Sequence, residues 1–166
     1  MTAQPKPLKR AKKPPKPIKR YKRPAFLRVR GGRGKLRKLA DDAMSLYVRC
    51  RGGWACSKCG LQVGIQCAHI VPKSGEGQAG RYSESNAVAL CSRCHTYYTS
   101  HPYEWRLWIG AETFDALHSL YSGKLVKWDL AEEARRFLLL TAKHYPEAQE
   151  RLTELNAQAN RLELWK

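Results

Sequence analysis

The sequence predicts an α+β protein: a small cysteine-stapled core with helices on both sides, preceded by a disordered basic tail. Two Cys-x-x-Cys pairs, at residues 56–59 and 91–94, bracket two strand-like segments. Helical periodicity occurs before the first pair and after the second. Residues 1–38 contain 16 Lys or Arg and no Asp or Glu, whereas the rest of the chain is nearly neutral.

The predicted tail covers residues 1–33. It holds six of the nine prolines and few apolar side chains, so it cannot bury enough surface to offset the entropy of ordering it. A polybasic segment binds polyanions because each neutralised phosphate releases counterions. We therefore expect DNA as a partner, with a solubilising or targeting tail as the alternative.

The next segments predict one helix and two strands. Leu39, Ala43 and Leu46 recur at helical spacing, which predicts a helix over residues 35–50. Alternation over residues 61–70 predicts a strand, and "NAVALC" at 86–91 predicts a second. We expect the two to pair as a hairpin across the Gly-rich loop 72–85. One face of the first strand would carry Leu61, Val63, Ile65, Cys67 and His69.

Four helices are predicted after the hairpin. A short one over residues 92–100 ends because Pro102 disfavours helical backbone at the residue before it. Another spans 103–123 and ends at a glycine, and a third spans 129–145, with Asp129 and Glu132 at capping-box spacing. Leucines at 152, 155 and 162 indicate the last. The predicted organisation is a tail (1–33), a cysteine core with flanking helices (34–125) and a C-terminal helical extension (126–166).

The six cysteines are interpreted through the expected compartment. No apolar run approaches the roughly 18 residues that span a bilayer, and no secretory signal begins the chain, so we expect a soluble cytoplasmic protein without a membrane partner. The cytosol keeps thiols reduced, and four thiolates suit a tetrahedral structural Zn²⁺, with a redox dithiol as the alternative. Cys50 and Cys67 lie on apolar faces and should be buried small hydrophobes.

The order of chemically capable residues is more specific than the cysteine count. A Cys-x-x-Cys pair is followed by His69 at a strand end, Asn86 at the start of the second strand, and a Cys-x-x-Cys pair directly before His95 on a helix. This order resembles the HNH, or His-Me finger, endonucleases, whose ββα-metal core grips one divalent cation. The resemblance implies His69 as general base, Asn86 as the brace of the loop and histidine, and His95 as ligand of a catalytic Mg²⁺ or other divalent ion such as Mn²⁺. It also implies a structural zinc on Cys56, Cys59, Cys91 and Cys94.

A narrower likeness covers residues 35–125. The segments "LYVRCR" and "QCAHI", the pair "RY" before the asparagine, and an aromatic helix after the second cysteine pair are similar to phage NinG (Rap)-type recombination endonucleases. This likeness implies a phage or prophage protein acting in a bacterial host cell, in DNA recombination, with branched DNA as a candidate substrate. Junction cleavage would favour a homodimer, for which the sequence has no separate signature.

The chemistry also follows from the residues themselves. Phosphodiester hydrolysis needs a nucleophilic water, charge stabilisation on the phosphate and help for the leaving oxygen. An imidazole with a pKa of about 6.5 can take the proton of the water at neutral pH, and a metal ion supplies the other two. Two histidines on different elements, held by a zinc staple, could meet across one metal-sized gap.

One position departs from the family pattern. Many relatives place a metal-binding aspartate or histidine directly before the base, where this chain has Ala68. Thr99, one helical turn after His95, and His101 are the further ligand candidates; otherwise water and the DNA phosphate complete the shell. The candidate phosphate contacts are Lys73, Arg81 and Arg93, with ordinary surface charge as the alternative.

The leading hypothesis is therefore a metal-dependent DNA endonuclease. The alternative is a noncatalytic zinc-stabilised nucleic-acid-binding protein, and the third hypothesis is a basic protein of a ribonucleoprotein particle. The set of His69, Asn86 and His95 favours catalysis, because a binding module would not require it.

Overall fold

The structure is a computed structural model that describes residues 31–73 and 75–164, and the predicted α+β class is confirmed. The elements in chain order are α2 (Gly31–Arg51), β1 (Ile65–His69), the 3-10 helix η1 (Gly75–Gly80), β2 (Ala87–Cys91), α3 (Ser92–Ser100), α4 (Pro102–Ile109), α5 (Ala111–Tyr121), α6 (Leu130–His144), the 3-10 helix η2 (Pro146–Ala148) and α7 (Gln149–Arg161). The predicted tail lies outside the described residues, except that residues 31–33 form the first turn of α2.

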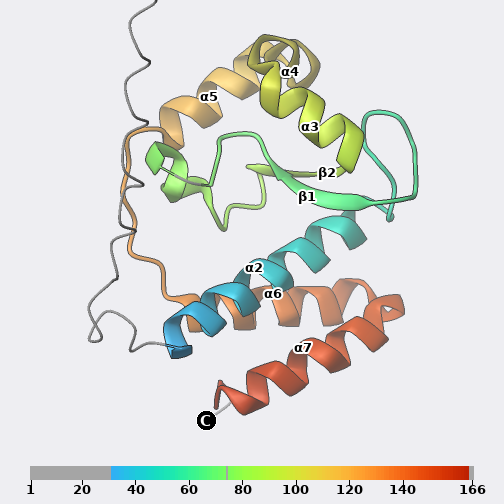
Figure 1. Cartoon of the computed structure of the whole chain (residues 1–166), viewed down its shortest axis with the longest axis vertical. Coiled ribbons are helices and arrows are strands. Elements are labelled where there is room, and N and C mark those ends of the chain that lie inside the picture. Colours follow the sequence, from blue (N-terminus) through green and yellow to red (C-terminus); the bar gives the residue numbers. More distant parts are fainter. Residues whose placement is uncertain (1–30, 74, 165–166) are drawn as a thin grey trace, which may run out of the picture.

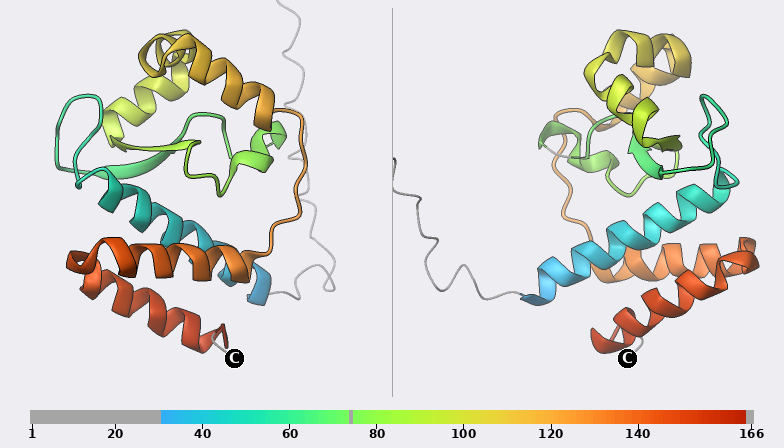
Figure 2. Two further views of the ribbon diagram at one scale, coloured as in Figure 1. Left: turned by 180° about the vertical axis from the view of Figure 1, so that it is seen from behind. Right: turned by 45° about the vertical axis from the view of Figure 1, so that its right-hand side comes forward.

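The hairpin lies between two groups of helices. Figure 1 shows α3, α4 and α5 on one side of the strands and α2 on the other, with α6 and α7 beyond α2. The two further views in Figure 2 show the same order. The buried side chains form two clusters, one that joins α2, α6 and α7 and one between the hairpin and α3–α5. The strands thus form a middle layer with a core on each face.

The predicted hairpin is confirmed, but its first strand is shorter than predicted. The strands are antiparallel, with Ile65 opposite Cys91 and His69 opposite Ala87. Residues 61–64 form a loop instead, and Leu61 and Val63 are 51% and 73% exposed. Glycines at 60 and 64, both at positive φ, turn the chain there. The cysteine loop therefore overrides the alternating pattern.

The helix predicted over residues 103–123 is two helices, α4 and α5. Gly110 lies between the two helices with φ 95° and ψ 127°. Glycine adopts this conformation readily, but a residue inside a helix does not have it, so the helix is interrupted there. The break lets α5 fold back along α4 and pack against η1. Trp105 is 4% exposed in the core, as expected for an aromatic helix that packs on the hairpin.

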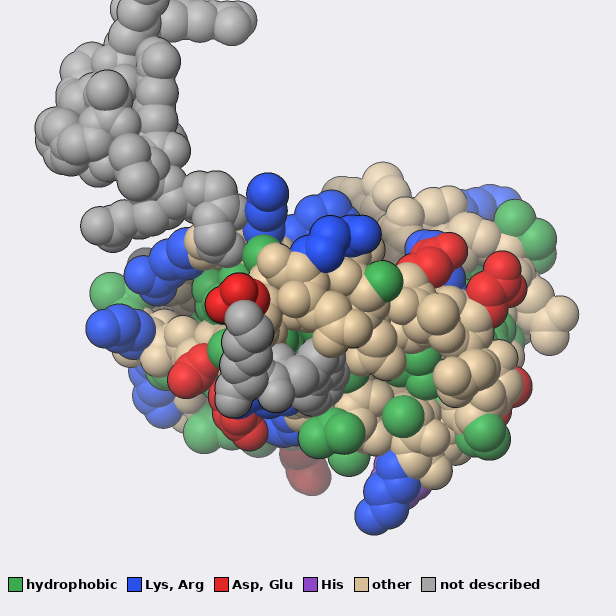
Figure 3. All heavy atoms as spheres, turned by 90° about the horizontal axis from the view of Figure 1, so that it is seen from below, with side chains coloured by type: hydrophobic (Ala, Val, Ile, Leu, Met, Phe, Trp, Pro, Cys, Tyr) green, Lys and Arg blue, Asp and Glu red, His purple; other side chains and the backbone are tan. Residues whose placement is uncertain are grey.

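The C-terminal helices belong to the same folded body as α2. Asp129 caps α6 by accepting hydrogen bonds from the backbone N–H groups of Ala131 and Glu132, as predicted. Phe137 and Leu152 are fully buried against α2. On the face viewed from below, Lys and Arg side chains and Asp and Glu side chains both occur, separated by wide areas of uncharged surface (Figure 3). None of the helices in the described ranges has an apolar stretch that could cross a membrane.

Candidate active site and zinc site

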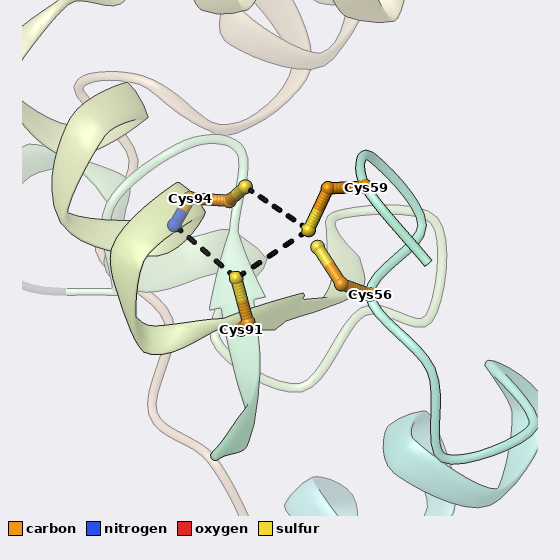
Figure 4. Close-up of side chains that lie close together, drawn as sticks. All are labelled: Cys56, Cys59, Cys91 and Cys94. Carbon is orange, nitrogen blue, oxygen red and sulfur yellow. Dashed lines mark hydrogen bonds between the residues drawn. The ribbon is translucent and has the colours of Figure 1, made fainter. Parts of the chain in front are cut away.

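The four cysteines of the two pairs meet at the open end of the hairpin. Cys56 and Cys59 come from the loop after α2, Cys91 ends β2, and Cys94 lies in the first turn of α3 (Figure 4). All four sulfurs lie within 4.8 Å of one another. The loop is tied to the second strand by a hydrogen bond from Ser57 N–H to the carbonyl of Ala89, at 2.9 Å.

The geometry of the sulfurs fits Zn²⁺. Sγ of Cys59 lies 3.8 Å from Sγ of Cys91 and 3.7 Å from Sγ of Cys94. A tetrahedral zinc with Zn–S bonds of about 2.3 Å places its sulfurs about 3.8 Å apart. These four residues could therefore hold a structural zinc. Cys50 is buried in the other cluster and Cys67 packs against it, as predicted for non-ligands.

Two of the clustered thiols, Cys56 and Cys94, have pKa values shifted in opposite directions. Burial raises the pKa of Cys56, but backbone hydrogen bonds at Cys91, Cys59 and Lys58 outweigh burial and lower that pKa to about 6. Burial and the neighbouring thiols raise the pKa of Cys94 to about 12. The lowered pKa of Cys56 favours its thiolate, and a thiolate is the form of cysteine that binds a divalent cation.

The predicted catalytic histidines line one pocket on the α3 side of the hairpin. His69 stands at the end of β1 and His95 in the first half of α3. Both contribute to a cavity of about 320 Å³, together with Lys73 and Thr99. The structure therefore brings His69 and His95 to one site from elements 26 positions apart in the sequence.

The tautomer of His69 is set by a backbone carbonyl. Its Nε2 lies 2.8 Å from the carbonyl oxygen of Arg81. A carbonyl oxygen only accepts, so Nε2 carries the hydrogen and Nδ1 keeps its lone pair. Burial lowers the pKa of His69 to about 4, and the charges of Lys73 and Arg81 act in the same direction. The imidazole is therefore neutral at pH 7 and able to accept a proton at Nδ1.

Asn86 holds the loop that presents this carbonyl. It is fully buried, and its side chain makes three hydrogen bonds. Oδ1 accepts from Val71 N–H at 2.8 Å, while Nδ2 donates to the carbonyls of Val71 at 2.9 Å and Gly80 at 3.0 Å. A Cβ at Gly80 would lie 2.6 Å from Nδ2 of Asn86, so this approach requires glycine. The Asn86 side chain thereby holds Val71 and Gly80, at the two ends of the loop beside the pocket, in place.

His95 is oriented by a residue that the sequence analysis did not single out. Its Nδ1 lies 2.7 Å from Oε1 of Gln66 on β1. Because the amide oxygen accepts, Nδ1 carries the hydrogen and Nε2 keeps a lone pair. Histidines that bind metals commonly donate their second N–H to an oxygen in this way. His95 is thus prepared to bind a metal ion through Nε2.

A scan against protein families adds an independent finding. Residues 56–101 match the HNH endonuclease family. The match begins at the first cysteine of the cluster and ends one residue after α3, so it covers the hairpin, both cysteine pairs and both pocket histidines. No match was found among curated proteins or among solved structures. The assignment of this HNH region therefore rests on the family model and on the geometry.

Ala68 occupies the position at which the HNH resemblance predicts a metal ligand. Ala68 is fully buried among Leu90, Tyr98 and other apolar side chains, and it does not line the pocket. Within the described ranges, the only group of three or more Cys, His, Asp or Glu side chains close enough to hold a metal ion is the cysteine cluster. The two predicted substitutes for the missing ligand differ. Thr99 lines the pocket, with its Oγ1 donating to the carbonyl of His95 at 2.8 Å.

His101, the other predicted substitute, does not line the pocket of the HNH region. It follows the last residue of α3, its ring stacks on Tyr97 with centroids 4.3 Å apart, and its Nδ1 bonds to the Tyr97 carbonyl. Both residues lie along a shallow hollow on the outer face of the helix, which Arg93 also lines. Arg93 is exposed and does not line the pocket of His69 and His95.

The remaining predicted phosphate contacts of the HNH region differ in what they touch. Lys73 is exposed at the pocket rim, and its charge lowers the pKa of both His69 and His95, although burial is the larger cause for each. Arg81 instead forms a two-point ion pair with Asp41 of α2, at 3.0 Å and 2.5 Å. Because its guanidinium is engaged within the protein, we assign Arg81 to loop support in place of phosphate binding.

Sequence reasoning missed two residues at this site, Gln66 and His118. Gln66 shares a strand face with Ala68, so the period of two could have drawn attention to it once Ala68 was seen to lack a ligand atom. His118 comes from α5 and lines the same pocket as the two predicted histidines. No spacing in the sequence links it to them.

Proposed function

We propose that the protein is a metal-dependent DNA endonuclease that hydrolyses phosphodiester bonds with His69 as general base. The observation that carries this proposal is the pairing of His69 and His95 across one pocket inside a region that matches the HNH endonuclease family. HNH endonucleases act on nucleic acids, and the basic N-terminal sequence supports DNA as the partner.

His69 would accept the proton of the attacking water at Nδ1. Its Nε2–H is held by the carbonyl of Arg81, which keeps the ring from turning and stabilises the charge that forms on the imidazole. Asn86 contributes indirectly, because it fixes the loop that carries this carbonyl. Lys73 at the rim is suited to bind a phosphate oxygen of the DNA.

His95 would hold the catalytic divalent ion through Nε2, with Gln66 fixing its ring. A bound Mg²⁺ or Mn²⁺ supplies charge stabilisation on the phosphate and help for the leaving oxygen. Because Ala68 provides no ligand and Thr99 is the predicted substitute that lines the pocket, we expect the DNA phosphate and water to complete the shell. Metal binding at this site should therefore be weak without DNA.

A role in phage DNA recombination, with branched DNA as substrate, is the finer part of this proposal. It rests on the likeness of residues 35–125 to NinG (Rap)-type endonucleases. The predicted homodimer belongs to the same proposal, since a symmetric junction suits two copies of the site.

The test is cleavage of linear duplex, single-stranded and four-way-junction DNA with Mg²⁺ or Mn²⁺. We expect metal-dependent cleavage by the natural chain and none after chelation of the catalytic ion. Stronger cleavage of the junction would support the recombination role. A protein that binds these DNAs and cleaves none of them with either metal would instead be the noncatalytic zinc-stabilised binder.

A further inference from the structure

The pocket beside the two histidines extends beyond what phosphodiester hydrolysis requires. Exposed side chains, among them Pro72, Lys73 and Pro102, form its rim, while Tyr98 and Trp105 are buried at its floor. Phe114 and His118, whose rings stack with centroids 4.3 Å apart, line it from α5. One end of the cavity is thus polar and carries the candidate catalytic groups, and the rest is aromatic.

The aromatic part contains two polar atoms without partners. Nε1 of Trp105 and Nε2 of His118 are both buried and make no hydrogen bond within the described structure. The two other such atoms belong to Glu133 and Arg136, which form an ion pair with each other on α6. Buried donors and acceptors are nearly always satisfied, because leaving one unpaired carries a desolvation cost that no hydrogen bond offsets. A ligand that hydrogen-bonds to both atoms would remove this cost.

The size and chemistry of the cavity fit one kind of ligand. An engineered cavity of about 150 Å³ in another protein accepts benzene, so a cavity of about 320 Å³ admits a larger ring with room for its attachment. A nucleobase offers a flat π-face for the aromatic walls and polar edge atoms for Trp105 and His118. Its sugar would leave the pocket at the polar end, next to Lys73 and the two catalytic candidates.

We propose that this pocket receives an unstacked base of the DNA strand, one nucleotide away from the phosphate that is cut. This inference rests on the proposed nuclease function, because the pocket is specific for a base only if the histidine end holds the phosphate. Enzymes that take a base out of the stack must supply the unstacking free energy, which is lowest where the base is already unpaired. The pocket therefore selects DNA with an unpaired base beside the cut over uniform duplex.

The experiment removes the base and the protein group separately and together. After the cut site is mapped with the natural chain, an abasic site is placed at each position flanking it, and binding is measured with the full-length His69→Ala chain. Loss of one base should weaken binding by about 5- to 150-fold at a single adjacent position, the range measured for base–aromatic contacts. Abasic sites several nucleotides away should have little effect.

The protein arms are Trp105→Phe, which keeps a ring and removes the N–H, and His118→Phe. Each should reduce the cost of removing that base. Trp108→Phe and His144→Phe are matched controls, because neither residue lines the pocket. Zinc content and melting temperature would verify that each variant is folded.

The outcomes separate this inference from the function beneath it. If the natural chain cleaves DNA and no flanking abasic position weakens binding, the base pocket is refuted while the nuclease assignment stands. If no DNA is cleaved, the abasic site is instead placed at every position of the DNA in turn; a loss of binding at a single position would then support the base pocket while the nuclease assignment is refuted. A dependence that Trp108→Phe abolishes as strongly as Trp105→Phe would place the base elsewhere.

Discussion

The buried cluster between the hairpin and α3–α5, on the side of the cysteine site, contains far fewer large apolar side chains than the cluster of α2, α6 and α7, which we call the helical half. The first cluster contains two of the four clustered cysteines and relies on Trp105, Tyr98 and Leu90, whereas the helical half extends from Leu39 to Leu164. A small core needs a covalent or metal staple to be stable, and a larger one does not. The comparison teaches that the candidate chemistry lies on the half with the smaller core, where four cysteines could hold zinc.

The helical half nevertheless reaches into the site. Arg136 of α6 donates to the carbonyl of Tyr82 at 2.6 Å, and Trp128 donates to the carbonyl of Gln78 at 2.9 Å. With the ion pair between Asp41 and Arg81, these contacts hold the loop between β1 and β2 from the side opposite the zinc. The site is thus supported from two directions. The helical half holds the loop between β1 and β2, and the cysteine cluster holds the other end of the hairpin.

Loss of the zinc site should have the largest effect. Binding of structural zinc is worth about 10–16 kcal/mol in small zinc domains, so Cys59→Ser, at an exposed sulfur, should release zinc and unfold the HNH region. Zinc per chain and limited proteolysis of residues 52–125 measure this. Cys50→Ala, which removes a buried thiol outside the cluster, is the control and should retain one zinc. A Cys59→Ser chain with full zinc and unchanged protection would contradict the account.

Truncation in the helical core should be the next largest. Phe137 is fully buried, and Phe→Ala changes at such sites lower the free energy of unfolding by about 3–5 kcal/mol. Phe137→Ala should do so in urea unfolding while zinc content stays at one per chain. Leu139→Ala, at a side chain 60% exposed on the same helix, should change stability little. Loss of zinc from Phe137→Ala would show that the two halves are not separable.

Asn86→Ala should lower the free energy of unfolding less than Phe137→Ala does, but it should also reduce DNA cleavage. It leaves the N–H and carbonyl of Val71 and the carbonyl of Gly80 without their partner, at about 1–3 kcal/mol for each group that water cannot reach. Cleavage should fall along with urea stability, because the loop that orients His69 loosens. Asn160→Ala, at an exposed position on α7, is the matched control. Full activity in Asn86→Ala would remove the bracing role.

The smallest expected effect is a shift in the pKa of His69. The pKa of His69 is lowered to about 4 from the usual value of about 6.5, so the unfolded chain takes up this proton first as pH falls. The contribution of His69 to stability is therefore complete above about pH 6.5 and is lost as pH falls toward 4. NMR titration of the His69 ring should find this pKa and show it rising in Lys73→Met. A midpoint near 6.5 would contradict the burial argument.

Local signals in the sequence predicted the elements, and long-range contacts decided the rest. Helix α3 has the predicted bounds because a cysteine and a proline mark its ends, and the order of cysteines and histidines predicted the shared pocket. The strand prediction failed at residues 61–64, where the cysteine loop prevails over alternation. The ion pair of Arg81 could not be predicted because its partner Asp41 lies 40 residues away, and His118 was missed because only tertiary packing brings α5 to the pocket.

The central claim is that His69 activates water in a metal-dependent cleavage of DNA. The most direct measurement is the single-turnover cleavage rate of the best DNA substrate by His69→Ala and by the natural chain, at saturating Mg²⁺ or Mn²⁺ and equal zinc content. Loss of a general base typically costs about 10²- to 10⁴-fold, and we predict a loss in this range with DNA affinity retained. An equal rate for His69→Ala, with His144→Ala as the control histidine, would contradict the account.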